Sequence, residues 1–280
     1  MPLIDIPPPP AYDLDGIKNQ NGLLTEEKEK IMKKFLALAL ALVMVLTLAA
    51  CSNPSSGEPA ADADAKSEGV MTYAEYIAAD MDAEVVVETY VQAKQSWWDN
   101  KATLYTQDKD GAYFLYNAVC TEEDYAKLVP GAKIRATGYK TEWSGEVEIA
   151  DATLEILEAP VYTAPALDAT ALLGTDELVK HQNEFAAFKG MTVEAMDDSG
   201  AAFFYSWDGS GQEGTDADLY FKVSKDGESY TFVVEYYLCN ETTPVYEAVR
   251  NLQVGDTVDI EGFIYWYEGP QPHVTSVTVK

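Results

Sequence analysis

Basic residues are scarce in this sequence. Nineteen lysines and arginines stand against 47 aspartates and glutamates, which gives a formal net charge of −28. Nucleic-acid binding draws much of its affinity from lysine and arginine contacts to phosphate. Anionic lipid headgroups repel an acidic surface for the same Coulombic reason. We therefore expect no nucleic-acid partner, and we interpret the charge as that of a well-solvated acidic surface.

Histidine and cysteine are also rare, with two histidines and three cysteines. Neither His181 nor His273 has a recognisable zinc-binding spacing, and the sequence has no Gly-x-Ser-x-Gly motif or cysteine-protease context. We expect no metal, no cofactor and no catalytic residue. Two alternatives stay open. The acidic, glycine-rich segment 208–218 is a candidate calcium loop, although its spacing differs from the EF-hand. The other alternative is a hydrolase that uses a pair of carboxylates. It stays open because acidic residues are so abundant that the sequence does not single out one pair.

Long apolar runs are missing as well. The run from Phe35 to Leu48 is shorter than the roughly 20 residues that span a bilayer. It follows Lys33-Lys34 and ends in small residues before Cys51, which are the parts of a secretory signal peptide. The motif resembles a bacterial lipoprotein signal, which implies that Cys51 is lipidated and holds the protein outside the cytoplasmic membrane. An uncleaved anchor or a buried helix is the alternative.

The segment before this signal is unusual, because a signal peptide normally begins at the start of a chain. We expect translation to begin at Met32, so that residues 1–31 are an untranslated upstream or disordered segment. Residues 32–50 then form the signal peptide. Residues 51–69 form the lipidated cysteine and a tether, which has no aromatic or β-branched residue after Cys51 and is predicted to be disordered.

An internal repeat organises the rest of the chain. Three glycines in each half share a seven-residue spacing: Gly131, Gly138 and Gly145, then Gly255, Gly262 and Gly269. In each half the first glycine opens a strand in which apolar and polar residues alternate. The second glycine lies inside that strand, where glycine usually marks a bulge or a bend.

Both halves are predicted to contain the same elements. The first half has helices at 73–79 and 121–128, strands at 84–93, 102–107, 112–116 and 147–157, and the strand opened by Gly131. The second has helices at 176–185 and 245–252 and strands at 191–196, 218–223, 230–237, 257–267 and 273–279. Asp-Gly turns between alternating runs predict a hairpin in each half.

Five strands with a helix between the third and the fourth resemble the OB fold, a partly open Greek-key barrel. We therefore predict an all-β fold with short helices, built as two tandem five-stranded OB-fold-like barrels. The expected domains are residues 70–158 and 176–280, joined by a linker at 159–175. The chain resembles secreted bacterial lipoproteins of tandem OB-fold domains. An immunoglobulin-like sandwich is the rival fold, which the internal helices disfavour.

All five tryptophans lie in predicted loops at corresponding places of the two halves. Trp97, Trp98 and Trp207 lie between the first and second strands, and Trp143 and Trp266 between the fourth and fifth. These loops border the ligand-binding face of OB folds, where aromatic rings stack on flat ligands or anchor a partner. We predict that the five tryptophans bind the ligand. The alternative is that they close the barrel ends as part of the core.

These features together predict a non-enzymatic, lipid-anchored, extracytoplasmic binding protein. Because the charge disfavours nucleic acid, the expected ligand is a glycan or another surface protein, with the membrane as a partner through Cys51. A structural or accessory envelope protein without a small ligand is the alternative. Cys120 and Cys239 fall at similar places in separate halves, so we expect two buried thiols more readily than a disulfide.

Overall fold

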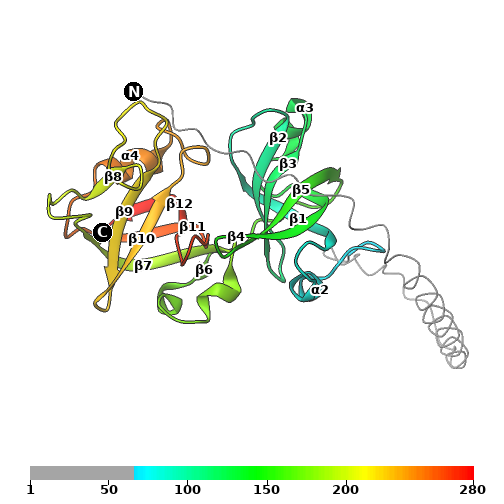
Figure 1. The fold of residues 1–280 in the computed structure, drawn as a ribbon, viewed down its shortest axis with the longest axis horizontal. Coiled ribbons are helices and arrows are strands. Elements are labelled where there is room, and N and C mark those ends of the chain that lie inside the picture. The colour runs from blue at the N-terminus through cyan, green and yellow to red at the C-terminus, as the bar shows by residue number, and fades with distance from the viewer. Residues whose placement is uncertain (1–65) are drawn as a thin grey trace, which may run out of the picture. The chain divides into compact units, whose positions relative to one another are not determined.

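The structure, a computed structural model, describes residues 66–280, which belong to one compact unit (Figure 1). The expected start at Met32, the signal peptide, Cys51 and most of the tether lie outside the described residues. None of the helices within 66–280 is both long enough and apolar enough to cross a membrane.

The first half of the described chain is a closed five-stranded barrel. Its strands are β1 (Glu84–Lys94), β2 (Lys101–Gln107), β3 (Ala112–Val119), β4 (Lys133–Trp143) and β5 (Glu146–Leu157), in the order β1-β2-β3-β5-β4. β3 and β5 are parallel and the other neighbours are antiparallel. Helix α2 (Tyr73–Ala78) precedes the barrel, and helix α3 (Glu122–Lys127) connects β3 to β4.

The second half repeats these connections. Its strands are β7 (Phe185–Glu194), β9 (Leu219–Lys225), β10 (Glu228–Val234), β11 (Thr257–Phe263) and β12 (His273–Val279). Helix α4 (Pro244–Arg250) connects β10 to β11, and the pairing of β7 with β9 closes the ring. Two short strands, β6 (Leu167–Asp168) and β8 (Phe203–Tyr205), pair with β7 and β9. The predicted fold of two tandem OB-fold barrels is therefore confirmed.

The alternating strands place their apolar residues inward, as the repeat predicts. Ile134 and Ala136 of β4 are fully buried in the first core, and Val258 and Ile260 of β11 are buried in the second. The mid-strand glycines also lie at irregularities of pairing, at Gly138 in β4 and beside Gly262 in β11. A Cβ at Gly138 would lie 2.7 Å from the carbonyl oxygen of Ala150, so the close approach of β5 requires glycine there.

The start of the second barrel differs from the sequence prediction. The helix expected at 176–185 is a 3₁₀ turn, η3 (Leu178–His181), preceded by η2 (Thr170–Leu172), and β7 begins earlier than predicted, at Phe185. The strand begins with Phe-Ala-Ala-Phe, of which Ala186, Ala187 and Phe188 are buried. A strand buried on both faces has no alternation of polar and apolar residues, so its period resembled the end of a helix.

An aromatic cluster joins the two barrels. Tyr105 of β2 and Phe114 of β3 point outward from the first barrel and are buried with Phe263 of β11. The rings of Tyr105 and Phe263 stack with centroids 4.3 Å apart, and the Tyr105 hydroxyl lies 2.7 Å from Nδ1 of His273. The second barrel therefore covers part of the outer face of β2 and β3.

Candidate ligand-binding face

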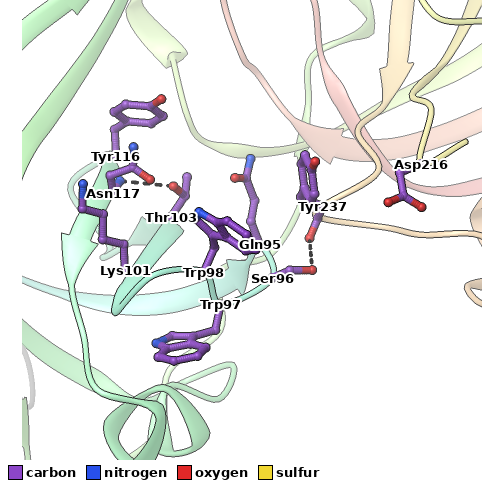
Figure 2. A pocket seen from close by; sticks show the side chains of 10 residues that line it. All are labelled: Gln95, Ser96, Trp97, Trp98, Lys101, Thr103, Tyr116, Asn117, Asp216 and Tyr237. Carbon is purple, nitrogen blue, oxygen red and sulfur yellow. Dashed lines mark hydrogen bonds between the residues drawn. The ribbon is translucent and has the colours of Figure 1, made fainter.

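The uncovered part of that face forms a cavity of about 450 Å³. It is lined by the loop after β1, by outward residues of β2 and β3, and by two loop residues of the second barrel (Figure 2). The lining residues are Gln95, Ser96, Trp97, Trp98, Lys101, Thr103, Tyr116, Asn117, Asp216 and Tyr237. The loop between the first two strands and the faces of strands two and three are the places where OB folds bind oligonucleotides and oligosaccharides.

Strand alternation explains which side chains reach this cavity. Ala102 and Leu104 of β2 point into the barrel core, so Thr103 and Tyr105 point outward. Tyr105 lies under the second barrel, whereas Thr103 lines the cavity. On β3, Tyr116 lines the cavity and its ring is stacked 6.5 Å from that of the covered Phe114. The open site and the covered cluster are thus two parts of one aromatic face.

Three aromatic rings at this cavity are exposed to solvent. The exposed fractions are 80% for Trp98, 45% for Tyr116 and 56% for Tyr237. Trp97 differs, because its indole donates a hydrogen bond of 2.9 Å to the Cys120 carbonyl oxygen and its ring points away from that of Trp98 (Figure 2). Trp97 therefore fixes the loop, and Trp98 presents a free ring.

Some polar groups of the cavity form hydrogen bonds within the protein, and others line the cavity where a ligand could contact them. The backbone N–H of Asn117 donates to Thr103 Oγ1 at 3.1 Å, which ties β3 to β2. The Ser96 hydroxyl donates to the Tyr237 carbonyl oxygen at 3.3 Å (Figure 2). The backbone N–H of Ser96 donates to the same oxygen at 2.8 Å, and the two bonds hold the loop against the second barrel. Lys101 is the one basic residue among the lining side chains of this described cavity. The site thus offers flat rings, amide groups, one positive charge at Lys101 and one negative charge at Asp216.

The other predicted site residues lie elsewhere. Trp143 is 62% exposed at the end of β4, and Trp207 is 76% exposed and lines a separate cavity of the second barrel. Trp266 is half-buried against Gly145, where an added Cβ would lie 2.7 Å from its Cδ1 atom. The structure thus brings Trp97 and Trp98 into one cavity and distributes the remaining three.

Sequence reasoning missed Lys101, Tyr116 and Tyr237. For Tyr116 a signal existed, because a tyrosine at an outward position of the third strand of an OB fold lies on its binding face. Tyr237 follows β10 and reaches the cavity through packing of the two barrels, which no local pattern encodes.

Three carboxylates of the acidic loop at 208–218 take part in hydrogen bonds or an ion pair with other residues of the second barrel. Asp208 Oδ1 accepts from the backbone N–H of Ser210, Glu213 pairs with Arg250, and Asp218 Oδ1 accepts from the backbone N–H of Tyr236. Within residues 66–280, no group of three or more histidine, cysteine, aspartate or glutamate side chains is arranged to hold a metal ion. Cys120 and Cys239 are both free and buried.

The described fold is similar to three solved structures. The tetrameric p202 HIN2 structure has a TM-score of 0.29 at 13% identity, covering 72% of this chain and 96% of that one. The Ifi202 HINa domain in complex with 20bp dsDNA has a TM-score of 0.32 at 12% identity, covering 71% and 98%. A replication protein A heterotrimer bound to ssDNA has a TM-score of 0.28 at 10% identity, covering 70% and 49%. No protein-family model and no curated protein sequence matches the chain.

Two predictions are corrected by these findings. The exclusion of nucleic acid was wrong, and so was the assignment of a glycan or another protein as the ligand, because the solved structures that resemble this chain include one complex with dsDNA and one with ssDNA. The physical reason lies in scale: net charge describes a whole surface, whereas an OB fold binds through one local face. None of the three similar structures is described as an enzyme. At these identities the likeness is one of fold, so the ligand has to be argued from this chain's own residues.

Proposed function

We propose that this chain binds short single-stranded nucleic acid by stacking bases on the aromatic rings of the first barrel's cavity. The observation that carries the proposal is the 80% exposed ring of Trp98 beside the outer face of β2 and β3. Tyr116 and Tyr237 line the same cavity with exposed rings. Base–aromatic stacking contributes about 1–3 kcal/mol per base and tolerates any sequence.

The polar lining suits the remaining parts of a nucleotide. The amides of Gln95 and Asn117 each offer a donor and an acceptor, which suits the edge of a base. Lys101 offers one contact to phosphate. Because the net charge of −28 opposes the approach of a polyanion, affinity has to come from stacking. We therefore expect a short segment to bind, and to bind more weakly than it binds to a basic OB-fold protein.

Titration of a labelled thymidine oligomer of about eight nucleotides, a length suited to one OB fold, tests this proposal by fluorescence anisotropy. Trp98→Ala should weaken binding about tenfold or more, because it removes one stacking surface. Trp143→Ala is the matched control, since Trp143 is also exposed but does not line the cavity, and it should bind as the wild type does.

Salt provides a second readout in the same titration. With one lysine at the site and an acidic surface around it, raising the salt concentration should leave affinity nearly constant or increase it, unlike binding dominated by phosphate contacts. Equal affinity of Trp98→Ala and wild type, or no binding of the oligomer, would refute the proposal.

We also propose that the protein works outside the cytoplasmic membrane, held there by lipid on Cys51, and that it is a binding protein and not an enzyme. The support for the location is the signal motif ending at Cys51. The support for a binding role is the composition of the cavity, because its aromatic rings and amides can hold a ligand without any catalytic group. Nucleic acid released from other cells would be the ligand in that location.

A further inference from the structure

The second barrel has its own cavity, of about 700 Å³, on the equivalent face. Tyr220 of β9 and Thr231 and Val233 of β10 line it from the strands that correspond to β2 and β3. Their neighbours on each strand point into the core, so these three point outward. The β11–β12 loop adds Tyr265 and Tyr267. The two barrels therefore present cavities at matching positions with different walls.

Aromatic rings form much of the second cavity. Trp207 is 76% exposed and Tyr267 is 46% exposed. The Tyr265 ring stacks on the His273 imidazole with centroids 4.1 Å apart. Burial lowers the pKa of His273 to about 3, so this ring is neutral at physiological pH and adds no positive charge to the cavity.

Carboxylates supply the rest of the wall. Glu235, Asp218 and Glu268 line the cavity, and its described lining contains no lysine or arginine. The backbone N–H groups of Tyr237 and Leu238 donate to Glu235 at 3.1 and 2.7 Å and hold its carboxylate in place. Burial, with the neighbouring Asp218 charge, raises the pKa of Glu235 to about 7.

We propose that this cavity binds the ammonium group of a small organic cation. Aromatic faces attract cations through their quadrupole, most strongly at tryptophan, and the carboxylates add attraction that a low local dielectric strengthens. An anion would meet the same carboxylates without a counter-charge. The cavity is therefore unsuited to phosphate, and the two barrels bind ligands of opposite charge.

Calorimetric titration of the full chain with choline tests this proposal, with 3,3-dimethylbutan-1-ol as the uncharged compound of the same shape. Choline should bind at least tenfold more tightly than the alcohol, because the alcohol lacks the charge that both rings and carboxylates recognise. Equal affinity of the two compounds would overturn the proposal, and so would no binding of choline.

Variants locate the site. Trp207→Ala and Glu268→Gln should each weaken choline binding about tenfold, since both side chains line the cavity from exposed positions where the change leaves the core intact. Trp98→Ala is the control and should bind choline as the wild type does. Unchanged choline affinity in both cavity variants would overturn the assignment.

A parallel titration with phosphatidylcholine vesicles distinguishes the sources of the ammonium group. Vesicle binding that free choline displaces would support the cavity and identify a lipid headgroup as the ligand. Binding of free choline without vesicle binding would support the cavity and identify a soluble amine.

Discussion

Glu146 is the most perturbed carboxyl group of the described chain that the two cavities leave unused. It is fully buried at the start of β5, where its Oε2 accepts a hydrogen bond of 2.9 Å from the Trp266 backbone N–H of the second barrel. Burial raises the pKa of Glu146 from 4.5 to about 8; the Glu148 charge adds to the rise, and the hydrogen bond from Trp266 opposes it. Glu146 is thus largely protonated at neutral pH.

This shift has a definite sign for stability. Between pH 4.5 and about 8 the folded state keeps a proton that the unfolded state releases, so the free energy of unfolding should fall as pH rises through that interval. Glu146→Gln carries no such proton and should reduce the fall, by no more than about 5 kcal/mol at 1.36 kcal/mol per pKa unit. Urea unfolding at pH 5 and pH 8 measures the difference.

Glu142→Gln is the control for that measurement, because Glu142 lies nearby on β4 but is exposed. It should keep the wild-type dependence on pH. The same slope in Glu146→Gln as in the wild type would show that Glu146 ionises normally in the folded protein.

At the scale of single residues, the sequence predicted where tryptophans lie but not what they contact. Hairpin and loop patterns placed four of the five outside the strands, as the structure has them, whereas Trp143 is the last residue of β4. Trp98 and Trp266 then differ because one faces solvent and the other packs against Gly145 of the other barrel. Such contacts form between segments far apart in the chain, and spacing within one sequence does not encode them.

Strand β4 depends on the glycine at its centre. Pairing with β5 shifts register between Thr137 and Tyr139, and a Cβ at Gly138 would lie 2.7 Å from the Ala150 carbonyl oxygen and 2.8 Å from Ile149 Cγ2. Gly138→Ala should lower the free energy of unfolding by about 1–3 kcal/mol, the usual cost of overpacking. Chemical denaturation measures this change.

Thr137→Ala, at the neighbouring half-buried position of β4, is the matched control and should change stability less. A Gly138→Ala loss below about 0.5 kcal/mol, the range of ordinary surface substitutions, would mean that β5 moves aside without cost.

At the scale of elements, alternation and turn residues predicted most strands closely. The strand expected at 273–279 is β12 with the same bounds, and the one expected at 84–93 is β1 with one further residue. β7 was predicted to begin at Met191 because its buried first residues have no alternation, and the short β8 was missed. Strands are predictable from sequence where one face is polar, and they become ambiguous where both faces are buried.

For the whole molecule, the acidic charge and the proposed anchor lead to one prediction. A chain of net charge −28 gains no attraction from an anionic membrane surface, so attachment should depend on the lipid proposed at Cys51 alone. Cys51→Ala should move the protein from the membrane fraction to the soluble fraction, as fractionation and immunoblotting would measure. The control variant Cys120→Ala, which changes a different cysteine, should stay in the membrane fraction. Retention of Cys51→Ala in the membrane fraction would contradict the proposed anchor.

The burial of Tyr105 and Phe114 with Phe263 means that the two halves of the repeat are not equivalent. In the first barrel, part of the outer face of β2 and β3 is buried against the second barrel and is not available to a ligand. If the first barrel were expressed alone, the Tyr105 and Phe114 rings would be exposed to solvent as a hydrophobic patch. The two barrels therefore have to be produced together if no new apolar surface is to be exposed. The two proposed sites have to be separated by substitutions and not by truncation.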